Sequence, residues 1–256
     1  MKKRLCLILL LATIAQVQAK PYEDIIASKV IRIGVPGDYA PLAFVDRQGQ
    51  LVGFDIDMAK SFAKSQGLTP QFVITSWPTL SADLTNDKYD IAMGGITYTP
   101  ERAKQFLLSG EVVTNGKVAL AACQSVGKVS SLAAINQPQV KVVVNPGGTN
   151  ETFVNQHIQQ AEVIRVKNNI DNLQALRDKR ADMMVTDLIE ANYYQHNEPG
   201  ILCLGTPKPF AGTESFKVYM TQKENIRLMD EINHWIPTSD KSALANKWGI
   251  SLELPK

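Results

Sequence analysis

Short apolar runs alternate along the chain with segments whose apolar residues recur at helical spacing. Val30–Val35 and residues 140–144 are β-branched runs that lead into loops rich in Gly and Pro, which is typical of strands. Residues 56–67 place their apolar side chains on one face, and Asp55 is predicted to cap this helix. The same pattern predicts strands at 51–54, 70–75, 89–93, 117–123, 162–166, 181–186 and 216–220, and helices at 80–86, 151–160, 169–178, 188–195, 224–235 and 241–248.

The order of these elements gives two α/β units in succession. Each unit runs strand, helix, strand, helix, strand, which implies parallel strands joined by right-handed crossovers. Ligands of open α/β sheets bind outside the carboxyl ends of the strands, where the loops of this chain are rich in Gly and Pro. We therefore expect an α/β protein with two lobes, each a mostly parallel sheet flanked by helices, and a ligand cleft between them.

Residues 1–19 have the pattern of a secretory signal peptide. Three basic residues at positions 2–4 precede an apolar stretch at 5–14, and the small residues Val17 and Ala19 suit cleavage before Lys20. The alternative is a membrane anchor, which needs about 20 apolar residues, and this stretch is shorter. The sequence therefore predicts export across a membrane.

Composition narrows the classes of function. The 256 residues are 45% hydrophobic and 20% charged, with a net charge of +2, as in ordinary globular proteins. Loss of the leader removes three of the 27 basic residues and leaves 24 against 25 acidic ones, so no basic patch points to a nucleic acid. With only three His and no CxxC spacing, we expect neither a metal site nor another cofactor.

Two cysteines, Cys123 and Cys203, remain once the leader is removed. An even pair in an oxidising compartment is typical of a disulfide, and two buried free thiols are the alternative.

Three segments of the first α/β unit carry a specific pattern: GDYAPL at 37–42, GFDIDMA at 53–59 and GGITYTPER at 94–102. Together they resemble the periplasmic amino-acid-binding proteins, a solute-binding family with two lobes and a hinge. The resemblance runs through nearly all of the mature chain and implies the type II periplasmic-binding-protein fold. It places lobe 1 at 20–120 plus 208–256 and lobe 2 at 121–207, after the signal peptide at 1–19.

The resemblance assigns ligand contacts in the first lobe. The arginine of GITYTPER binds the ligand's α-carboxylate in that family, and here it is Arg102. A planar guanidinium group can bind a carboxylate through two parallel hydrogen bonds. The alternative, which the charge pattern alone favours, is a solvent-exposed arginine in the first turn of a helix. The backbone near Gly95 and the hydroxyl of Thr97 are expected to donate further hydrogen bonds. Tyr39 and Trp77 resemble the family's aromatic walls, although either alone also fits a core.

The second lobe is expected to contribute an anion site. Thr149 and Asn150 open the helix that follows Gly147 and Gly148, and helix N-termini bind anions through free N–H groups. A plain N-cap is the alternative, and both roles are compatible.

Further segments narrow the resemblance: TSWPTL at 75–80, DIAMGGI at 90–96, NGK at 115–117, NPGGTNE at 145–151 and MMVTDLIEA at 183–191. They resemble the cyclohexadienyl dehydratases, periplasmic enzymes on this binding-protein fold. Those enzymes are carbon–oxygen lyases that convert prephenate to phenylpyruvate, and arogenate to phenylalanine, with loss of CO2 and water. The positions of Cys123 and Cys203 also resemble that family's cysteine pair.

The dehydratase resemblance assigns the reacting groups. Such a site has to hold two carboxylates and protonate the departing hydroxyl, so it needs cations and one acid that stays neutral near pH 7. The resemblance gives the acid as Glu190, although the helix pattern alone favours a solvated residue there. Lys117 is expected to pair with a substrate carboxylate near the hinge, the alternative being an exposed lysine at a strand edge.

Asp187 occupies the position that holds the ligand's ammonium group in amino-acid binders. The alternative is a plain N-cap of the following helix. An aspartate there suits arogenate, which keeps an amino group, and repels prephenate unless Lys117 offsets its charge.

Two functions share this fold, so the fold alone does not separate them. One is the dehydratase, and the other is a receptor that hands an amino acid to an ABC permease. Glu190 with Lys117, and glycines in the GGIT loop where receptors often carry serines, favour the enzyme. Either function implies a small carboxylate-bearing partner and no nucleic acid, and a homo-oligomer such as a trimer is compatible with the dehydratase resemblance.

Overall fold

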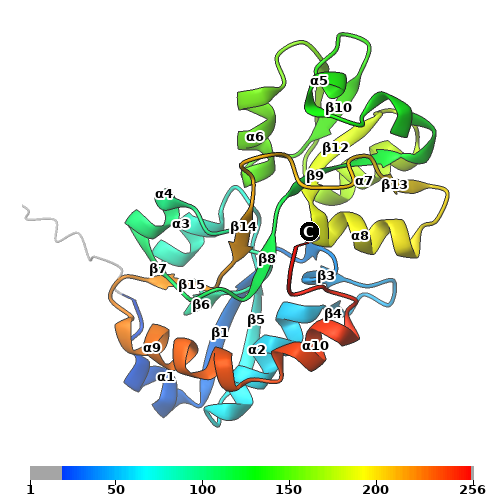
Figure 1. Ribbon diagram of the computed structural model, residues 1–256. Coiled ribbons are helices and arrows are strands. Elements are labelled where there is room, and N and C mark those ends of the chain that lie inside the picture. The colour runs from blue at the N-terminus through cyan, green and yellow to red at the C-terminus, as the bar shows by residue number, and fades with distance from the viewer. Residues whose placement is uncertain (1–18, 255–256) are drawn as a thin grey trace, which may run out of the picture.

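The computed structural model describes residues 19–254, which form two lobes that are each built on a five-stranded sheet (Figure 1). The predicted two-lobed α/β architecture is confirmed. The predicted signal peptide lies outside the described residues except for Ala19. Within the described part of the chain, no helix combines the length and the apolar character needed to cross a membrane.

The first lobe contains a mixed sheet with the strand order β5-β1-β6-β15-β7. β1 pairs in parallel with β5 and β6, as the predicted strand–helix alternation requires, whereas β15 is antiparallel to β6 and β7. Its strands are β1 (Val30–Val35), β5 (Thr69–Ile74), β6 (Ile91–Ala92), β7 (Phe106–Leu108) and β15 (Met220–Gln222). Its helices are α1 (Tyr22–Ser28), α2 (Phe54–Ser65), α3 (Leu80–Thr85), α4 (Pro100–Gln105), α9 (Ile226–Trp235), the 3-10 turn η2 (Ile236–Thr238) and α10 (Lys241–Lys247).

The second lobe repeats this plan with the strand order β11-β10-β12-β9-β13. β10 is parallel to β11 and β12, and β9 is antiparallel to β12 and β13. Its strands are β9 (Lys117–Ala122), β10 (Lys141–Val144), β11 (Glu162–Arg165), β12 (Met183–Asp187) and β13 (Leu202–Leu204). Its helices are η1 (Cys123–Lys128), α5 (Leu132–Ile135), α6 (Thr149–His157), α7 (Asn169–Arg177) and α8 (Leu188–Asn197).

Two antiparallel strands, β8 (Val113–Asn115) and β14 (Ser215–Lys217), run between the lobes (Figure 1). The predicted lobe boundary at residues 120–121 falls inside β9, the whole of which belongs to the second sheet. The other predicted lobe limits stay predictions.

A small antiparallel meander follows β1 and leads into α2. It consists of β2 (Asp38–Tyr39), β3 (Ala43–Val45) and β4 (Leu51–Val52). β2 begins just after β1 ends, so the meander lies at the carboxyl end of that strand, the edge at which ligands of such sheets bind.

The prediction that Asp55 caps α2 was wrong. Gly53 is the N-cap of this helix, and Asp55 lies in its first turn. The Asp55 carboxylate instead accepts hydrogen bonds from the Gly95 backbone N–H at 2.7 Å and from the Tyr219 hydroxyl at 3.0 Å. Because these partners are distant in sequence, this buried carboxylate connects α2 to the GGIT loop.

The strand predicted at 216–220 is two strands. β14 ends at Lys217 and β15 begins at Met220, because the chain leaves the interlobe ribbon there and enters the first sheet. A continuous apolar run does not reveal such a change of pairing partner. Several short elements were also not predicted, namely α1, β2, β3, α4, β7, β8, η1, α5, β13 and η2.

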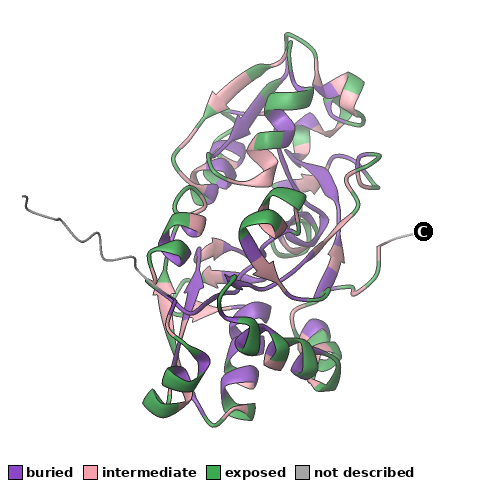
Figure 2. Cartoon of the chain, turned by 90° about the vertical axis from the view of Figure 1, so that its left-hand side faces the viewer, coloured by how far each residue is buried: buried purple, intermediate pink, exposed green. Residues whose placement is uncertain are grey.

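Each sheet forms the core of its lobe, with the outer faces of the helices exposed (Figure 2). α9 illustrates the packing, since Leu228, Ile232 and Trp235 recur at helical spacing and are buried in the cluster that also contains Ile31 and Ile33 of β1. This burial confirms the amphipathic helix predicted near the carboxyl terminus.

A disulfide joins Cys123 to Cys203 across 80 residues, so the alternative of two free thiols was wrong. The bond ties η1 to β13 and closes a loop that contains nearly all of the second lobe. We expect reduction, or the double Cys→Ala variant, to lower the free energy of unfolding by about 4 kcal/mol, because a cross-link restricts the unfolded chain. Urea unfolding with and without a reductant measures this, and equal midpoints would contradict it.

Candidate functional site

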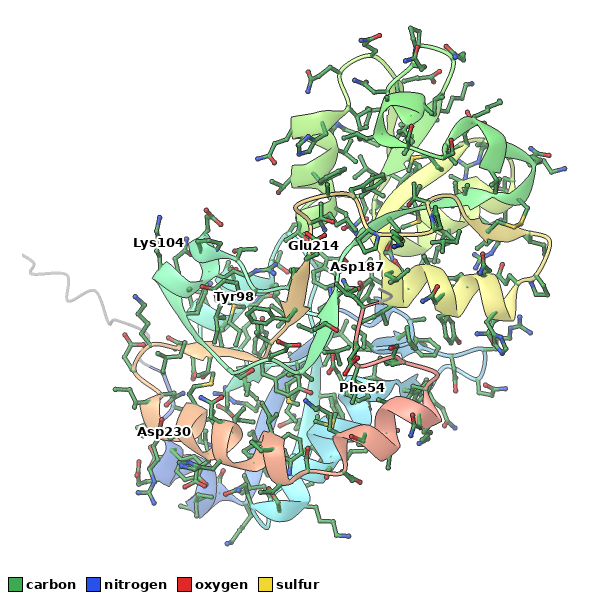
Figure 3. All side chains as sticks on the ribbon, in the orientation of Figure 1. Phe54, Tyr98, Lys104, Asp187, Glu214 and Asp230 are labelled. Atoms are coloured by element: carbon green, nitrogen blue, oxygen red, sulfur yellow. A yellow bond between two sulfur atoms is a disulfide. The ribbon has the colours of Figure 1, made fainter. Side chains whose placement is uncertain are left out.

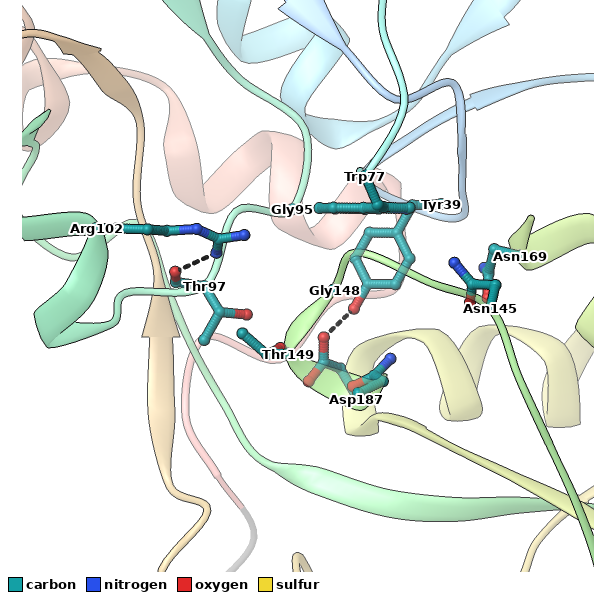
Figure 4. A pocket seen from close by; sticks show the side chains of 11 residues that line it. Tyr39, Trp77, Gly95, Thr97, Arg102, Asn145, Gly148, Thr149, Asn169 and Asp187 are labelled. Carbon is teal, nitrogen blue, oxygen red and sulfur yellow. Dashed lines mark hydrogen bonds between the residues drawn. The ribbon is translucent and has the colours of Figure 1, made fainter. Parts of the chain in front are cut away.

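The site lies where the two lobes meet, and Asp187 marks this junction in Figure 3. Eight residues predicted to bind the ligand line one cavity there (Figure 4): Tyr39, Trp77, Gly95, Thr97, Arg102, Thr149, Asn150 and Asp187. Asn145, Gly148 and Asn169 complete the lining. The first lobe contributes Tyr39, Trp77, Gly95, Thr97 and Arg102, and the second lobe contributes the other lining residues. The cavity therefore exists only when the two lobes are together.

The lobes are closed on this cavity. Its free volume is about 30 Å³, which is room for only a few water molecules. A Cβ on Gly147 of the second lobe would lie 2.3 Å from the Pro78 nitrogen of the first, so only glycine allows this approach. Asn169 Nδ2 also donates across the lobes to the Asp38 carbonyl at 3.0 Å. A larger ligand therefore fits into this cavity only when the lobes move apart.

Arg102 is held in the first turn of α4 with its guanidinium in the cavity. The Thr99 side chain caps the helix by accepting a hydrogen bond from the Arg102 backbone N–H at 3.2 Å. Nη1 donates to the Thr97 carbonyl at 2.7 Å, and no arginine ion pair within residues 19–254 involves Arg102. Burial lowers the pKa of this group, which the charge of Asp187 partly offsets. The guanidinium is thus a partly buried cation without a carboxylate partner among the described residues, which suits an incoming carboxylate.

Two aromatic side chains form the wall from the first lobe. The rings of Tyr39 and Trp77 meet edge to face with centroids 5.6 Å apart. Gly95 lies against this wall with φ +79°, and a Cβ there would lie 2.3 Å from the Tyr39 ring. Burial raises the pKa of Asp55, which holds the Gly95 N–H, to about 6.

Lys117 begins β9 and points at the start of α6. Its Nζ donates to Thr149 Oγ1 at 2.9 Å and to Asn150 Oδ1 at 2.6 Å. The residue is only 8% exposed, because β9 lies inside the second sheet, so the alternative of an exposed lysine at a strand edge was wrong. Burial lowers the pKa of Lys117, and the nearby carboxylate of Asp187 opposes that shift.

The alternative of a plain N-cap at Thr149 or Asn150 was also wrong. Gly148 is the N-cap of α6 and no side chain caps it. Both side chains instead accept hydrogen bonds from Lys117, so they bring a cation to the N-terminus of this helix.

Asp187 is fully buried at the N-cap position of α8, but its side chain does not cap the helix. Oδ2 accepts hydrogen bonds from Lys217 Nζ at 2.6 Å and from the Tyr39 hydroxyl. Burial acts to raise the pKa of Asp187, but the ammonium groups of Lys217 and Lys117 hold it well below its usual range. The carboxylate is therefore ionised, with Oδ2 paired, whereas the buried Oδ1 has no hydrogen-bond partner among the described residues.

Glu190 does not line the cavity itself, but it contacts Asn169, which does. Its carboxyl accepts a hydrogen bond from Asn169 Nδ2 at 2.6 Å and another from the Thr186 hydroxyl, and the residue is 0% exposed. Burial raises the pKa of Glu190 to about 8 against these hydrogen bonds, and the charge of Asp187 adds to the increase. The side chain is therefore protonated at neutral pH, and the alternative of a solvated helix residue was wrong.

Sequence reasoning missed Lys217, Asn145 and Asn169. Asn169 connects the cavity to Glu190, and Asn145 lines the cavity and accepts a hydrogen bond from Asn172 at 2.6 Å. A signal for Lys217 was present, since it is a lone charge in the apolar run from Phe216 to Met220. Asn145 begins the NPGGTNE segment that carries the family resemblance, so a signal for it was present as well, whereas no such signal marks Asn169.

No group of three or more His, Cys, Asp or Glu within residues 19–254 is arranged to hold a metal ion.

A comparison with known families matches residues 31–250 to the bacterial extracellular solute-binding proteins, family 3. The chain belongs to this family. Among the family 3 relatives is cyclohexadienyl dehydratase of Pseudomonas aeruginosa, 34% identical over 239 residues that make up 93% of this chain and 88% of that protein. The L-cystine-binding protein TcyJ of Escherichia coli is 26% identical and covers 84% of this chain and 81% of its own.

Solved structures give the same picture of the family 3 fold. The ancestral amino acid-binding protein AncCDT-1, described as a precursor of cyclohexadienyl dehydratase, superposes with a TM-score of 0.81 at 32% identity, over 88% of this chain and 98% of that one. An ancestral cyclohexadienyl dehydratase, AncCDT-3, is 43% identical, covers 90% and 97% of the two chains and has a TM-score of 0.53. The resemblance to both dehydratases and amino-acid binders is confirmed, and the extracellular character of the family agrees with the predicted export.

Proposed function

We propose that this chain is a periplasmic cyclohexadienyl dehydratase that converts prephenate to phenylpyruvate. The observation that carries the proposal is the fully buried Glu190, whose pKa of about 8 keeps it protonated beside the cavity that Arg102 lines. Lys117 does not line this cavity but donates hydrogen bonds to Thr149 and Asn150 of its wall. A receptor for a solute needs no such acid, whereas elimination of a hydroxyl does. The identity of 34% with a dehydratase over 93% of the chain supports the same function.

The proposed reaction balances with one proton donor. The bond between the prephenate ring and its carboxylate breaks, and CO2 leaves. The electron pair of that bond restores the aromatic ring and expels the ring hydroxyl. The hydroxyl takes the proton of Glu190 and leaves as water, and Glu190 regains a proton from the solvent.

The cations have separate tasks in this proposal. Arg102 binds the pyruvyl carboxylate, because its guanidinium is the cation of the cavity without a carboxylate partner among the described residues. Lys117, held by Thr149 and Asn150, faces the ring carboxylate from the second lobe. Tyr39 and Trp77 offer apolar ring faces to the cyclohexadiene.

Opening of the lobes is part of the proposal. The cavity of about 30 Å³ is smaller than the substrate, so the substrate has to widen it. Asn169 separates Glu190 from the cavity and also bridges to Asp38 of the other lobe. When the lobes open, this bridge breaks, and we propose that the Glu190 carboxyl then faces the substrate beside Asn169.

Turnover of prephenate tests the function directly. The purified mature protein is expected to form a product that absorbs as phenylpyruvate in alkali, with kcat on the order of 10 per second, as is common for enzymes. Arogenate is the parallel substrate, with phenylalanine as the expected product.

The alternative is a receptor for an ABC transporter, which the similarity to the L-cystine-binding protein favours. Calorimetric titration with amino acids distinguishes the two functions. Tight binding of an amino acid, together with no turnover of prephenate or arogenate, would establish the receptor and exclude the enzyme.

A further inference from the structure

Three buried asparagine side chains form a chain of hydrogen bonds, which we call the amide relay, between Glu190 and the cavity. They are Asn169 and Asn172 of α7 and Asn145, which follows β10, and they are 3%, 2% and 8% exposed. Asn145 and Asn169 both line the cavity (Figure 4). Asn172 Nδ2 joins them, since it donates to Asn145 Oδ1 at 2.6 Å and to Asn169 Oδ1 at 3.3 Å. The proposed mechanism assigns no role to Asn145 or Asn172.

The direction of the amide relay is fixed at Asn169. A main-chain carbonyl can only accept hydrogen bonds, and Asn169 Nδ2 donates to the Asp38 carbonyl at 3.0 Å. The same nitrogen donates to Glu190 Oε1 at 2.6 Å, so both of its N–H groups are used. Asn169 therefore turns its oxygen toward Asn172. The contact with Glu190 lies within the second lobe and does not depend on closure of the lobes.

The direction passes through Asn172 to Asn145. Because Asn169 presents an oxygen, Asn172 has to present its nitrogen, and the second N–H of that nitrogen meets Asn145 Oδ1. Asn172 Oδ1 is then buried without a hydrogen-bond partner among the described residues. An unsatisfied buried oxygen destabilises a fold, so stability alone does not explain an asparagine at this position.

The amide relay leaves the nitrogen of Asn145 as the polar group that is available to a ligand. Its Oδ1 is occupied by Asn172, and its Nδ2 has one contact among the described residues, a donation to the Pro146 carbonyl at 3.4 Å. An amide nitrogen carries two N–H groups, so one remains for a ligand oxygen. This donor comes from the second lobe, whereas Arg102 belongs to the first.

We propose that Asn172 is a positioning residue that turns the Asn145 amide so that its nitrogen faces the ligand. Asn145 then donates to an oxygen of a carboxylate ligand and supplements the cations Arg102 and Lys117. If the amide were turned the other way, its carbonyl oxygen would face the carboxylate, and two acceptors cannot form a hydrogen bond. The inference goes beyond the proposed function, because it needs only a carboxylate ligand and holds for a dehydratase and a receptor alike.

Removal of the Asn172 donor tests the amide relay. In N172L the Asn145 amide loses the partner that fixes its direction, so KM for prephenate is expected to rise about tenfold, the typical effect of one hydrogen bond to a charged group. The value of kcat is expected to stay within about twofold, because an interaction that is equal in the ground state and the transition state affects KM alone. N172A serves if N172L does not fold. The matched control is Q174L, since Gln174 is exposed on the same helix, and its KM is expected to equal that of wild type.

A double-mutant cycle with N145A separates positioning from a structural defect. N145A alone is expected to raise KM about tenfold. Addition of N172L to N145A is expected to change KM no further, because Asn172 acts through Asn145. Additive effects of the two substitutions, or an unchanged KM in a folded N172L or N172A variant, would overturn the proposal.

Failure of the proposed function has a different signature, namely no turnover of prephenate by the wild-type protein. The same variants are then compared by calorimetry with phenylpyruvate and phenylalanine, which both carry a carboxylate. A loss of about tenfold in the affinity of N172L for the ligand that wild type binds would support the amide relay without the enzyme. Equal affinities of N172L and wild type, or binding of neither ligand to wild type, would overturn the inference.

Discussion

Replacement of Glu190 by Gln is expected to lower kcat/KM for prephenate by at least about 100-fold, the usual contribution of a general acid. Gln has nearly the same shape and still bonds to Asn169 and Thr186, so the fold is expected to remain. It has no proton to give to the departing hydroxyl. The measurement is the rate of phenylpyruvate formation by E190Q, alongside a thermal unfolding curve.

The pH profile of prephenate turnover by the wild-type protein provides an independent readout. Because the pKa of Glu190 is raised to about 8, the acid form predominates below this pH and disappears above it. The value of kcat/KM is therefore expected to fall tenfold per pH unit above about pH 8. E162Q is a suitable control, since Glu162 is exposed on β11, and it is expected to keep both the rate and the profile. Full activity in E190Q would exclude Glu190 as the acid.

The variant Asp187→Ala is expected to lose about 3–5 kcal/mol of stability, because it leaves buried ammonium groups without their counter-charge. Lys217 is only 2% exposed and Lys117 only 8%, so neither side chain reaches the solvent without rearrangement. Urea unfolding of D187A and wild type gives the difference directly.

The pH dependence of D187A separates this cause from a simple packing defect. A buried, unpaired lysine has a lower pKa in the folded than in the unfolded state, so stability rises with pH between those two values. The loss in D187A is therefore expected to be smaller at pH 9 than at pH 6. D178A is the matched control, because Asp178 pairs with Arg180 at an exposed site, where such a pair contributes at most about 1 kcal/mol. A loss that is equal at both pH values would contradict the ion-pair explanation.

Local sequence patterns predicted the elements that have strong periodicity or a β-branched run. Val30–Val35 was predicted as a strand and observed as β1, and residues 162–166 correspond to β11 within one residue. Short elements such as β2 and β13 carry too few residues for a pattern, and long-range pairing forms them. The same reason explains the division of 216–220 between two sheets.

The sequence predicts eight of the eleven cavity-lining residues, because these eight belong to motifs that resemble a family. Arg102 is an example, since charge counting alone would have left it on the surface. The resemblance named Glu190 as well, but the sequence did not show that this carboxyl is buried. Burial depends on Asn169 and Thr186, and the first of these lies 21 residues away.

By itself, the sequence determined two α/β units, a pair of cysteines suited to an oxidising compartment and a set of candidate residues for carboxylate binding. Only the tertiary structure decided which charges are paired and which acid is protonated. Lys217 meets Tyr39 across 178 residues and Thr97 across 120, and no local pattern encodes such contacts. A pKa depends on the solvent and the charges around a group, so the properties of Asp187 and Glu190 exist only once the lobes bury them.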